Sequence, residues 1–546
     1  MATTAFTGAE SVSRARGPRL DDGFGLAGRI GFAAALLGGL AYAAYGIWSD
    51  TSSVGETVAA GTLFFLALAL LIALGFEFVN GFHDTANAVA TVIYTRSMPA
   101  PLAVVWSGVW NFLGVMFSSG AVAYSIISLL PVDLILNIGS GAGFAMIFAL
   151  LIAAIGWNLA TWYVGLPNSS SHALIGSILG VGLANQLLAG GASGTAGVDV
   201  DQARKVLTGL LLAPVIGFIG AYVLLKVLQR VARNPALFRE PDGDAPPPRG
   251  IRALLIGTCT AVSFAHGGND GQKGMGLIML ILIGCAPTAY ALNRTGSAND
   301  TPAFVQASNA AEGVFARRAS GAVLPVEEAR AVLTGALRAR AVSDPRTFAA
   351  LGAVSASVRE QVGTYGSIAQ VPAGATQGLR GDMYLLTDTA KLVAKAEGAN
   401  ALAEPEMKAV DDYVGDLQGG TRYIPTWVKV AVALALGLGT MVGWKRIVVT
   451  VGEKIGKTHM TYGMGASAEL MAASTILLAE RFGLPVSTTH ILTSGVAGAS
   501  VANGAGLQGR TVRNMALAWV VTLPATMALS GGLYWVFLQA VRVFGG

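Results

Sequence analysis

Residues 165–172 read GLPNSSSH, and 318 positions later residues 483–490 read GLPVSTTH. A second pair of similar stretches precedes them: GFHDTANA at 81–88 and GGNDGQKG at 267–274, which are 186 positions apart. The two offsets differ by 132 residues, the length of segment 293–424, which holds 13 Lys/Arg and 14 Asp/Glu. We interpret the sequence as an internal duplication whose second copy is interrupted by a charged, water-exposed insertion.

The composition places both copies in a membrane. Of the 546 residues, 53% are hydrophobic and 12% are charged, about half the charge of a soluble domain. This excludes a disordered chain and disfavours a soluble enzyme. A crossing takes about 20 apolar residues. Crossings are predicted at 25–47, 61–93, 102–128, 142–164, 172–190, 206–228, 251–292, 425–444, 461–480, 484–502 and 514–540. Segments 61–93 and 251–292 are too long for one straight crossing, so we expect each to be broken or re-entrant.

Basic residues give the expected orientation. Lys and Arg favour cytoplasmic loops, and they cluster at 226–252 and 445–457, whereas the joins at 48–60 and 129–141 contain none. With the N-terminus inside, the basic loops are cytoplasmic and 293–424 lies outside. Because each copy has an odd number of crossings, five, the second copy is expected to have the opposite orientation in the membrane. This is the inverted-repeat plan of many secondary transporters, whose sites lie between the repeats.

The predicted fold is therefore an all-α polytopic membrane protein with two inverted-topology repeats of about five crossings each, broken or re-entrant helices and an extra N-terminal helix. Its expected location is the cell inner (plasma) membrane. The expected parts are a cytoplasmic N-terminus with the extra helix (1–60), the first transport repeat (61–228), a basic cytoplasmic linker (229–250), the start of the second repeat (251–292), the soluble insertion (293–424) and the rest of the second repeat (425–546).

Two further features concern the ends and the thiols. Segment 25–47 follows Arg14, Arg16 and Arg19, and it fits an uncleaved anchor helix better than a signal peptide, whose apolar core is shorter. Cys259 and Cys285 both lie in apolar segments, so neither a disulfide framework nor a metal cluster is implied.

Ionisable residues within the apolar segments form two matched clusters. In the first copy the spacing of 3, 4 and 3 would place the residues on one face of a helix, and the second copy repeats the 4 and 3. Such residues in hydrocarbon are usually functional, although they also serve to hold helices together. Their duplication favours a functional site. The residues are Glu77, Asn80, Asp84 and Asn87, and then His266, Asp270 and Lys273.

Each GLP motif places three hydroxyl residues directly before an apolar helix. Hydroxyl residues at a helix start cap free N–H groups, and the same groups form an anion site. Two symmetric triplets are expected to enclose a tetrahedral oxyanion. Four of the five histidines, His83, His172, His266 and His490, lie in or beside the motifs and suggest proton handling, while His172 and His490 equally suit orienting the triplets. The triplets are Ser169, Ser170 and Ser171, and Ser487, Thr488 and Thr489.

These motifs resemble those of the inorganic phosphate transporter (PiT) family, in particular its bacterial low-affinity branch. The resemblance rests on NGFHDTANAVATVIYTR (80–96), GLPNSSSHALIG (165–176), FAHGGNDGQKGMGL (264–277), GWKRIVVTVGEKIGK (443–457), GLPVSTTH (483–490) and GGLYW (531–535). It implies a symporter of inorganic phosphate, often dimeric, that works by alternating access. It also implies that Asp84, Asn87, Asn269 and Asp270 form the ion and phosphate site and that the two hydroxyl triplets hold phosphate.

The sequence departs from the family pattern at two positions. His83 and Lys273 stand where the family has Asn, and they suit a sodium ion poorly because Na⁺ takes oxygen ligands. The coupling ion is therefore expected to be a proton rather than sodium. The species transported with it is expected to be phosphate alone or a neutral complex of phosphate with a divalent metal. The expected proton-coupling residues are His83, His266, Asp84, Asp270, Lys273 and Glu77.

The remaining expectations concern partners and alternatives. No catalytic residue, cofactor, resident metal or nucleic-acid partner is expected, and the partners are phosphate, the proton, the lipid bilayer and a second copy. A permease for another oxyanion such as sulfate would use the same architecture. A membrane-embedded hydrolase is the alternative from another class, but the sequence has neither a His-Glu-x-x-His nor a Gly-x-Ser-x-Gly signature.

Overall fold

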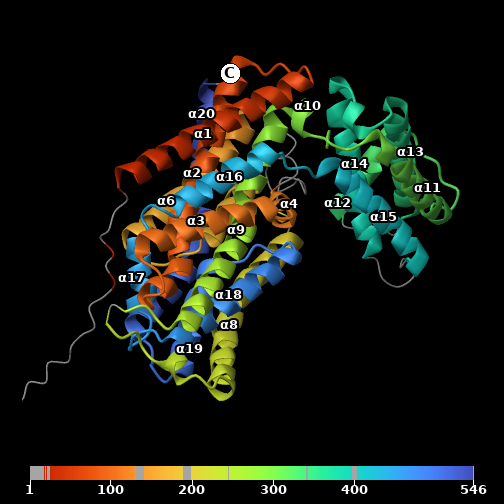
Figure 1. Cartoon of the computed structure of the whole chain (residues 1–546). Coiled ribbons are helices and arrows are strands. Elements are labelled where there is room, and N and C mark those ends of the chain that lie inside the picture. Colours follow the sequence, from red (N-terminus) through yellow and green to blue (C-terminus); the bar gives the residue numbers. More distant parts are fainter. Residues whose placement is uncertain are drawn as a thin grey trace, which may run out of the picture.

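The computed structural model of the chain describes residues 25–130, 140–188, 200–243, 245–339, 344–395 and 402–544, with the single positions 18, 20, 198 and 342. In this part of the chain the regular elements are helices, and one isolated bridge joins Gly456 to Leu507. Figure 1 shows a bundle of long helices with a smaller group of helices beside it. Seven described helices are long and apolar enough to cross a membrane: α1 (Leu26–Ser53), α2 (Ala60–Tyr94), α3 (Ala100–Phe117), α6 (Gly141–Tyr163), α7 (Ser170–Leu188), α8 (Val200–Val231) and α20 (Gly509–Phe544).

The two halves have the same order of elements. In the first half, α2 is followed by α3 and the short α4 (Ala121–Ile127), by the pair α6 and α7, and by α8. In the second half, α9 (Arg249–Cys285) and α10 (Pro287–Tyr290) precede the insertion. They are followed by α16 (Thr426–Gly439), the short α17 (Lys445–Glu453), the pair α18 (Tyr462–Arg481) and α19 (Thr488–Ala502), and α20. The opposite orientation of the two halves in a membrane stays a prediction.

The prediction that segment 61–93 is broken is wrong, because α2 is one continuous helix of 35 residues. Segment 251–292 is broken near its end, where Ala286 separates α9 from α10. α2 and the 37-residue α9 are each longer than a straight crossing needs, which tilt or extension beyond the hydrocarbon accommodates. Further breaks lie in two other predicted crossings. Gly120, with φ +84°, separates α3 from α4 within predicted crossing 102–128, and Gly443, with φ +71°, lies between α16 and α17. Both take the left-handed conformation that glycine tolerates best.

Two helical hairpins contain the duplicated GLP motifs. Residues 164–169 join α6 to α7, and residues 482–487 join α18 to α19. The Ser and Thr residues after each turn are buried rather than solvated. The hairpins therefore carry the hydroxyl triplets into the interior of the bundle.

The principal contacts join opposite halves. α7 packs along α20 and α19 along α8, while α3 packs along α9 and α16 along α2. Some of these helices approach closely through glycine, as is common in membranes: a Cβ at Gly81 of α2 would lie 2.3 Å from the Leu436 carbonyl oxygen of α16. The two halves are therefore interleaved rather than stacked side by side.

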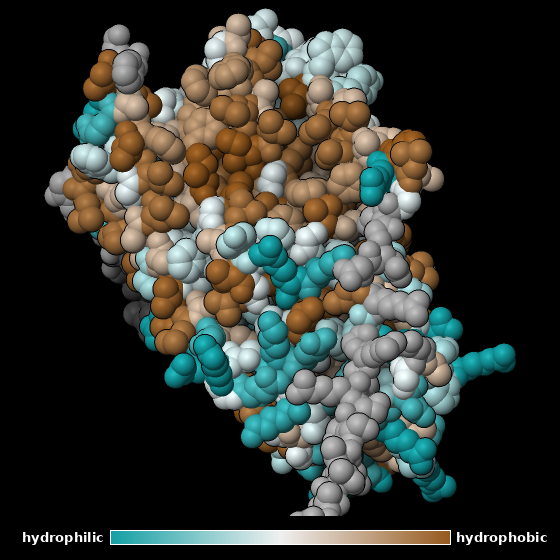
Figure 2. Space-filling view, turned by 90° about the vertical axis from the view of Figure 1, so that its left-hand side faces the viewer, coloured by the Kyte–Doolittle hydropathy of each residue, from teal (hydrophilic) through white to brown (hydrophobic). Residues whose placement is uncertain are grey.

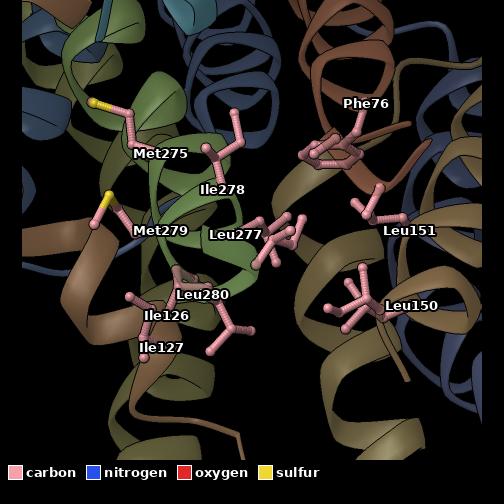
Figure 3. Packing of buried hydrophobic residues seen from close by; sticks show 14 of the residues in the cluster. Phe76, Ile126, Ile127, Leu150, Leu151, Met275, Leu277, Ile278, Met279 and Leu280 are labelled. Carbon is pink, nitrogen blue, oxygen red and sulfur yellow. The ribbon is translucent and has the colours of Figure 1, made fainter. Parts of the chain in front are cut away.

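Apolar packing surrounds the crossing of α2 and α9. Leu277 and Leu280 of α9 are buried with Phe76 of α2 and with Leu150 and Leu151 of α6 in one cluster (Figure 3). This dry layer holds the helices at fixed positions beside the polar residues one to two turns away. The outer surface is also apolar, and Figure 2 shows a broad hydrophobic zone on one face above a hydrophilic zone.

The insertion forms a helical bundle with a core of its own. Its helices are α11 (Thr301–Arg318), α12 (Val326–Ala339), α13 (Pro345–Tyr365), α14 (Ala373–Ala394) and α15 (Glu404–Thr421), and they enclose buried residues such as Phe315, Leu351 and Leu386. Figure 1 shows this bundle at the side of the long helices. Its two ends meet, because the backbone N–H of Asn293 donates to the Gly420 carbonyl at 2.8 Å.

Helix α1 lies against α16. Gly39, Ala43 and Gly46 are its buried residues, and a Cβ at Gly46 would lie 2.4 Å from the Trp427 ring. The Trp427 indole N–H donates to Asp50 at 2.8 Å. A stripe of small residues and one hydrogen bond therefore attach the extra helix to the second half.

Candidate functional site

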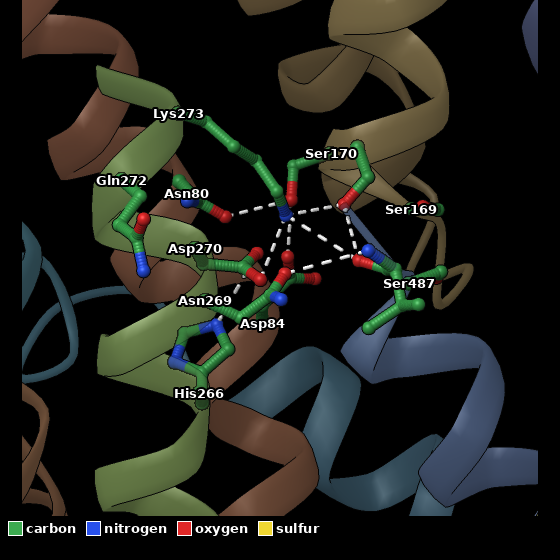
Figure 4. Close-up of polar contacts among 12 residues, drawn as sticks. Asn80, Asp84, Ser169, Ser170, His266, Asn269, Asp270, Gln272, Lys273 and Ser487 are labelled. Carbon is green, nitrogen blue, oxygen red and sulfur yellow. Dashed lines mark hydrogen bonds and ion pairs between the residues drawn. The ribbon is translucent and has the colours of Figure 1, made fainter. Parts of the chain in front are cut away.

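Asp84 lies where both hairpins meet α2. Its carboxylate accepts a hydrogen bond from the Ser170 hydroxyl of the first hairpin and another, at 2.5 Å, from the Thr489 hydroxyl of the second. The Ser170 hydroxyl also lies 2.6 Å from Asn80 Oδ1, and Asn80 Nδ2 lies 3.4 Å from Glu77. These side chains are buried. One carboxylate thus links three elements that are far apart in the sequence (Figure 4).

Asp270, the counterpart of Asp84, has different neighbours. Lys273 Nζ forms an ion pair with Asp270 Oδ1 at 2.7 Å and also donates to the Ser171 hydroxyl. Ser171 in turn donates to the Val486 carbonyl at 2.8 Å. The fully buried Lys273 therefore lies between the Asp270 carboxylate and the first hairpin. Asp84, its counterpart, instead accepts hydrogen bonds directly from the hairpin hydroxyls.

Each carboxylate has a histidine beside it. His83 Nδ1 lies 3.3 Å from Asp84, and its Nε2 lies 3.2 Å from the Thr161 hydroxyl. His266 Nε2 lies 3.6 Å from Asp270 Oδ2. Its Nδ1 lies 2.8 Å from Asn111 Oδ1. Both imidazoles are buried and hydrogen-bonded, so a proton on either ring would face a carboxylate.

The members of each hydroxyl triplet have separate roles. Ser169 and Ser487 accept hydrogen bonds at 3.1 Å from the backbone N–H groups of His172 and His490, as capping residues do. Ser170, Ser171 and Thr489 contact the charged residues, as described above. The remaining hydroxyl, Thr488 Oγ1, is buried and has no hydrogen-bond partner among the described residues.

Asn269 connects α9 to the second hairpin. Its Nδ2 donates to the Leu484 carbonyl at 3.1 Å, and its Oδ1 accepts from the Val486 N–H at 3.4 Å. The Asn269 amide thus fixes the Pro-containing turn that precedes Ser487, so Asn269 has a structural role in addition to placing a polar group beside the site. Asn87 is the one predicted site residue whose side chain lies outside the described residues.

The histidines that follow the triplets lie against each other with their rings tilted by 42°. The rings of His172 and His490 have centroids 4.5 Å apart, and the Trp519 ring of α20 lies 4.2 Å from His490. His172 Nδ1 also lies 2.9 Å from the Ser169 hydroxyl. Neither ring contacts Asp84 or Asp270 in any described interaction, which favours their orienting role.

A fourth buried carboxylate, in addition to Glu77, Asp84 and Asp270, is missing from the predicted site. Glu469 of α18 is fully buried, receives a hydrogen bond from Thr258 at 2.5 Å and receives another from Thr91. It joins α18 to both long helices, α2 and α9. Glu469 could have been found from the sequence, because it is a charged residue within predicted crossing 461–480. It lies in neither duplicated motif.

The charged centre has the ligand types of a cation site. Asp84, His266 and Asp270 each offer one ligand atom, and these atoms lie within 4.8 Å of one another. Lys273 already neutralises Asp270 at this place. The centre therefore combines two carboxylates, two imidazoles and one ammonium group within a shell of hydroxyls.

A buried polar centre enclosed by long apolar helices is typical of multi-pass membrane transporters. Comparison with known proteins gives the family: residues 80–530 match the phosphate transporter family, and the chain belongs to it. The chain is 43% identical over 495 residues to the low-affinity inorganic phosphate transporter PitA of Escherichia coli, which covers 87% of this chain and 97% of that protein. PitB of the same bacterium is 40% identical over 506 residues, with coverage of 89% and 99%.

One solved structure is also similar. It is the structure of a protein described as the sodium-dependent phosphate transporter, and it matches with a TM-score of 0.48 and 20% identity, over 88% of this chain and all of that chain. The family and the apolar helices together make the protein a multi-pass membrane protein, located in bacteria in the inner membrane.

Proposed function

We propose that the protein imports inorganic phosphate together with protons, by alternating access between two inverted repeats. The observation that carries the proposal is the joint contact of Ser170 and Thr489 with Asp84, because it makes one site from both halves. The names of the PitA and PitB relatives support inorganic phosphate as the substrate.

The residues around the centre suit a phosphate ion. The N-termini of α7 and α19 both begin at the hydroxyl triplets, and free N–H groups and dipoles at helix starts favour anions. The Lys273 ammonium supplies a positive charge, and the unpartnered Thr488 hydroxyl is available to a ligand. A bound phosphate would accept hydrogen bonds from Lys273 or from the hydroxyls, which would then leave their present partners.

The contacts of the two carboxylates favour protons as the coupling ion. A sodium ion takes several oxygen ligands, whereas Asp84 has His83 as a neighbour and Asp270 has His266 and Lys273. A protonated lysine would repel a bound cation. These groups suffice for protons, which need only titratable side chains.

A complex of phosphate with a divalent metal is the second candidate for the transported species. The cluster of Asp84, His266 and Asp270 favours it, because these ligand types bind divalent ions. In that case the metal is cargo that travels with phosphate. Equal uptake of labelled phosphate with and without a metal chelator would exclude it.

The packing supports alternating access. Each hairpin packs along the long helix of the opposite half, α7 along α20 and α19 along α8. A rotation of one such pair against α2 and α9 would separate Ser170 or Thr489 from Asp84. The site would then open on one side while it stays closed on the other.

Uptake by proteoliposomes tests the proposal. The purified chain should accumulate labelled phosphate when the outside is made acidic, and labelled sulfate should neither enter nor compete. Empty liposomes and liposomes without a pH gradient are the controls. Sulfate uptake at a similar rate would show a general oxyanion permease, and hydrolysis of phosphate esters without uptake would show an enzyme.

A further inference from the structure

The face between α1, α3 and the end of α16 contains a groove that the transport site does not use. Its volume is about 470 Å³, within the range of small-molecule sites. On the α1 side it is lined by Gly31, Phe32 and Ala35, and on the other side by Val105, Leu438, Met441 and Val442. Every one of these residues is apolar or glycine, so the groove offers no hydrogen bond to a polar ligand along its length.

One end of the groove is positively charged. Arg29 lines it and is exposed. Helices α1 and α16 run in opposite directions, because Gly39 faces Leu434 and Gly46 faces Trp427. The N-terminal end of α1, with Arg29, therefore lies beside the end of α16. The groove is thus apolar along its walls and cationic at one end.

We propose that this groove binds one acyl chain of an anionic phospholipid, with the lipid phosphate beside Arg29. An apolar groove on the outside of membrane helices is filled by hydrocarbon from the bilayer, and basic residues at the edge of a membrane segment attract anionic headgroups. The groove depends on α1, which lies before the region that matches the phosphate transporter family, residues 80–530. The opposite wall, Val105, Leu438, Met441 and Val442, lies within that region.

Two variants separate the acyl chain from the headgroup. Gly31→Trp fills the groove, and a Cβ at Gly31 meets nothing within 4 Å, so the substitution starts from open space. Its matched control is Gly38→Trp on the same helix, which is equally unobstructed but does not line the groove. Arg29→Gln removes the charge without filling the groove, and Arg233→Gln in an exposed loop is its control.

Native mass spectrometry measures the bound lipid. The full chain in detergent is mixed with equal amounts of phosphatidylglycerol and phosphatidylethanolamine that carry the same acyl chains. We expect one phosphatidylglycerol on the wild type and on Gly38→Trp, and its loss in Gly31→Trp. Arg29→Gln should keep a bound lipid but lower the preference for phosphatidylglycerol about fivefold, the effect of one basic residue near an anionic surface, while Arg233→Gln should not change it.

Four results would overturn the proposal. The first is equal binding of the two lipids by the wild type, and the second is undiminished phosphatidylglycerol on Gly31→Trp. The third is a dimer that only Gly31→Trp disrupts, which would show that a second copy fills the groove. Glycerol phosphate, the headgroup without its chains, should not displace the lipid, and displacement would equally contradict a site built on the acyl chain.

Discussion

At the scale of single residues, Asp84 and Asp270 occupy equivalent positions in the two motifs but have different environments. Asp84 accepts hydrogen bonds from hydroxyls of both hairpins, whereas Asp270 is paired with Lys273 at 2.7 Å. Burying an ion pair is costly unless further hydrogen bonds support it, and Ser171 supplies one to the lysine. The centre is therefore symmetric in sequence and asymmetric in charge.

The first prediction concerns these carboxylates. Asp84→Asn and Asp270→Asn keep the shape of the side chain and remove its charge, so phosphate uptake should fall by about 100-fold or more, as expected for loss of ~3 kcal/mol from a buried charged hydrogen bond. Initial uptake rates in proteoliposomes measure this. Asp242→Asn makes the same change in an exposed loop and should transport normally. Near wild-type uptake by either site variant would contradict a shared carboxylate site.

The second prediction concerns the coupling ion. Wild-type uptake should need an inward proton gradient but no sodium, and a protonophore should abolish it. His83→Asn and Lys273→Asn each place an amide beside a carboxylate and should weaken the response to the proton gradient. His459→Asn, in a basic loop away from the centre, should leave it unchanged. Sodium-dependent uptake that survives the protonophore would exclude proton coupling but not the phosphate site.

At the scale of helices, the GLP motifs allowed a correct prediction of where the hydroxyl triplets lie, because Pro followed by Ser or Thr marks a helix start. The continuity of α2 through segment 61–93 was not predictable from its length, because a helix longer than the hydrocarbon can tilt as well as break. The contact of Lys273 with Ser171 was also not predictable, because it depends on the distance between α9 and the first hairpin, and local sequence patterns do not give that distance. Glu469 was overlooked because it belongs to no repeated motif.

The third prediction concerns the contact of α2 with α16. A Cβ at Gly81 would lie 2.3 Å from the Leu436 carbonyl oxygen, so Gly81→Val should force the helices apart and lower the stability of the protein by ~1–3 kcal/mol. Gly75→Val on the same helix has nothing within 4 Å of its Cβ and should have little effect. Thermal unfolding followed by size-exclusion chromatography compares the two. Equal stability of both variants would contradict the close approach.

The fourth prediction concerns two helices of the insertion. Arg330 of α12 binds both carboxylate oxygens of Asp382 of α14 at 2.7 Å, and these contacts raise the pKa of Arg330. Arg330→Met leaves the buried Asp382 unpaired and should destabilise the insertion by ~2 kcal/mol, seen as faster hydrogen exchange in α12 and α14. Lys408→Met breaks an exposed pair with Asp412 and should change exchange little. Phosphate uptake should be unaffected by both.

At the scale of the whole molecule, the helical bundle of the insertion is attached to the bundle of long apolar helices by two chain segments that meet. The hydrogen bonds from Asn293 to the carbonyls of Gly419 and Gly420 bring the ends of the insertion together, and its core is separate from the cores of the membrane helices. We therefore expect the second half to form without the insertion.

The fifth prediction follows from this attachment. Replacing 293–424 with a short Gly/Ser linker should leave phosphate uptake within about twofold of wild type, since a short flexible loop costs little to close. By the distribution of basic loops, protease added to intact cells should cleave the wild-type insertion. Cleavage only in inverted vesicles would reverse the proposed topology, and loss of uptake in the folded deletion variant would give the insertion a role in transport.

The interleaved packing also has a consequence for how the protein is made. Asp84 meets Ser170 after 86 further residues but Thr489 only after 405. At ~5–20 residues per second, a ribosome needs on the order of 20–80 s to supply the second partner. During that interval the first half resides in the bilayer with its acidic centre incomplete. Nascent chains that stall before α19 therefore hold Asp84 with its partners from the first half, Ser170 and His83, but without Thr489, so its hydrogen bonding is complete only when the second hairpin has entered the membrane.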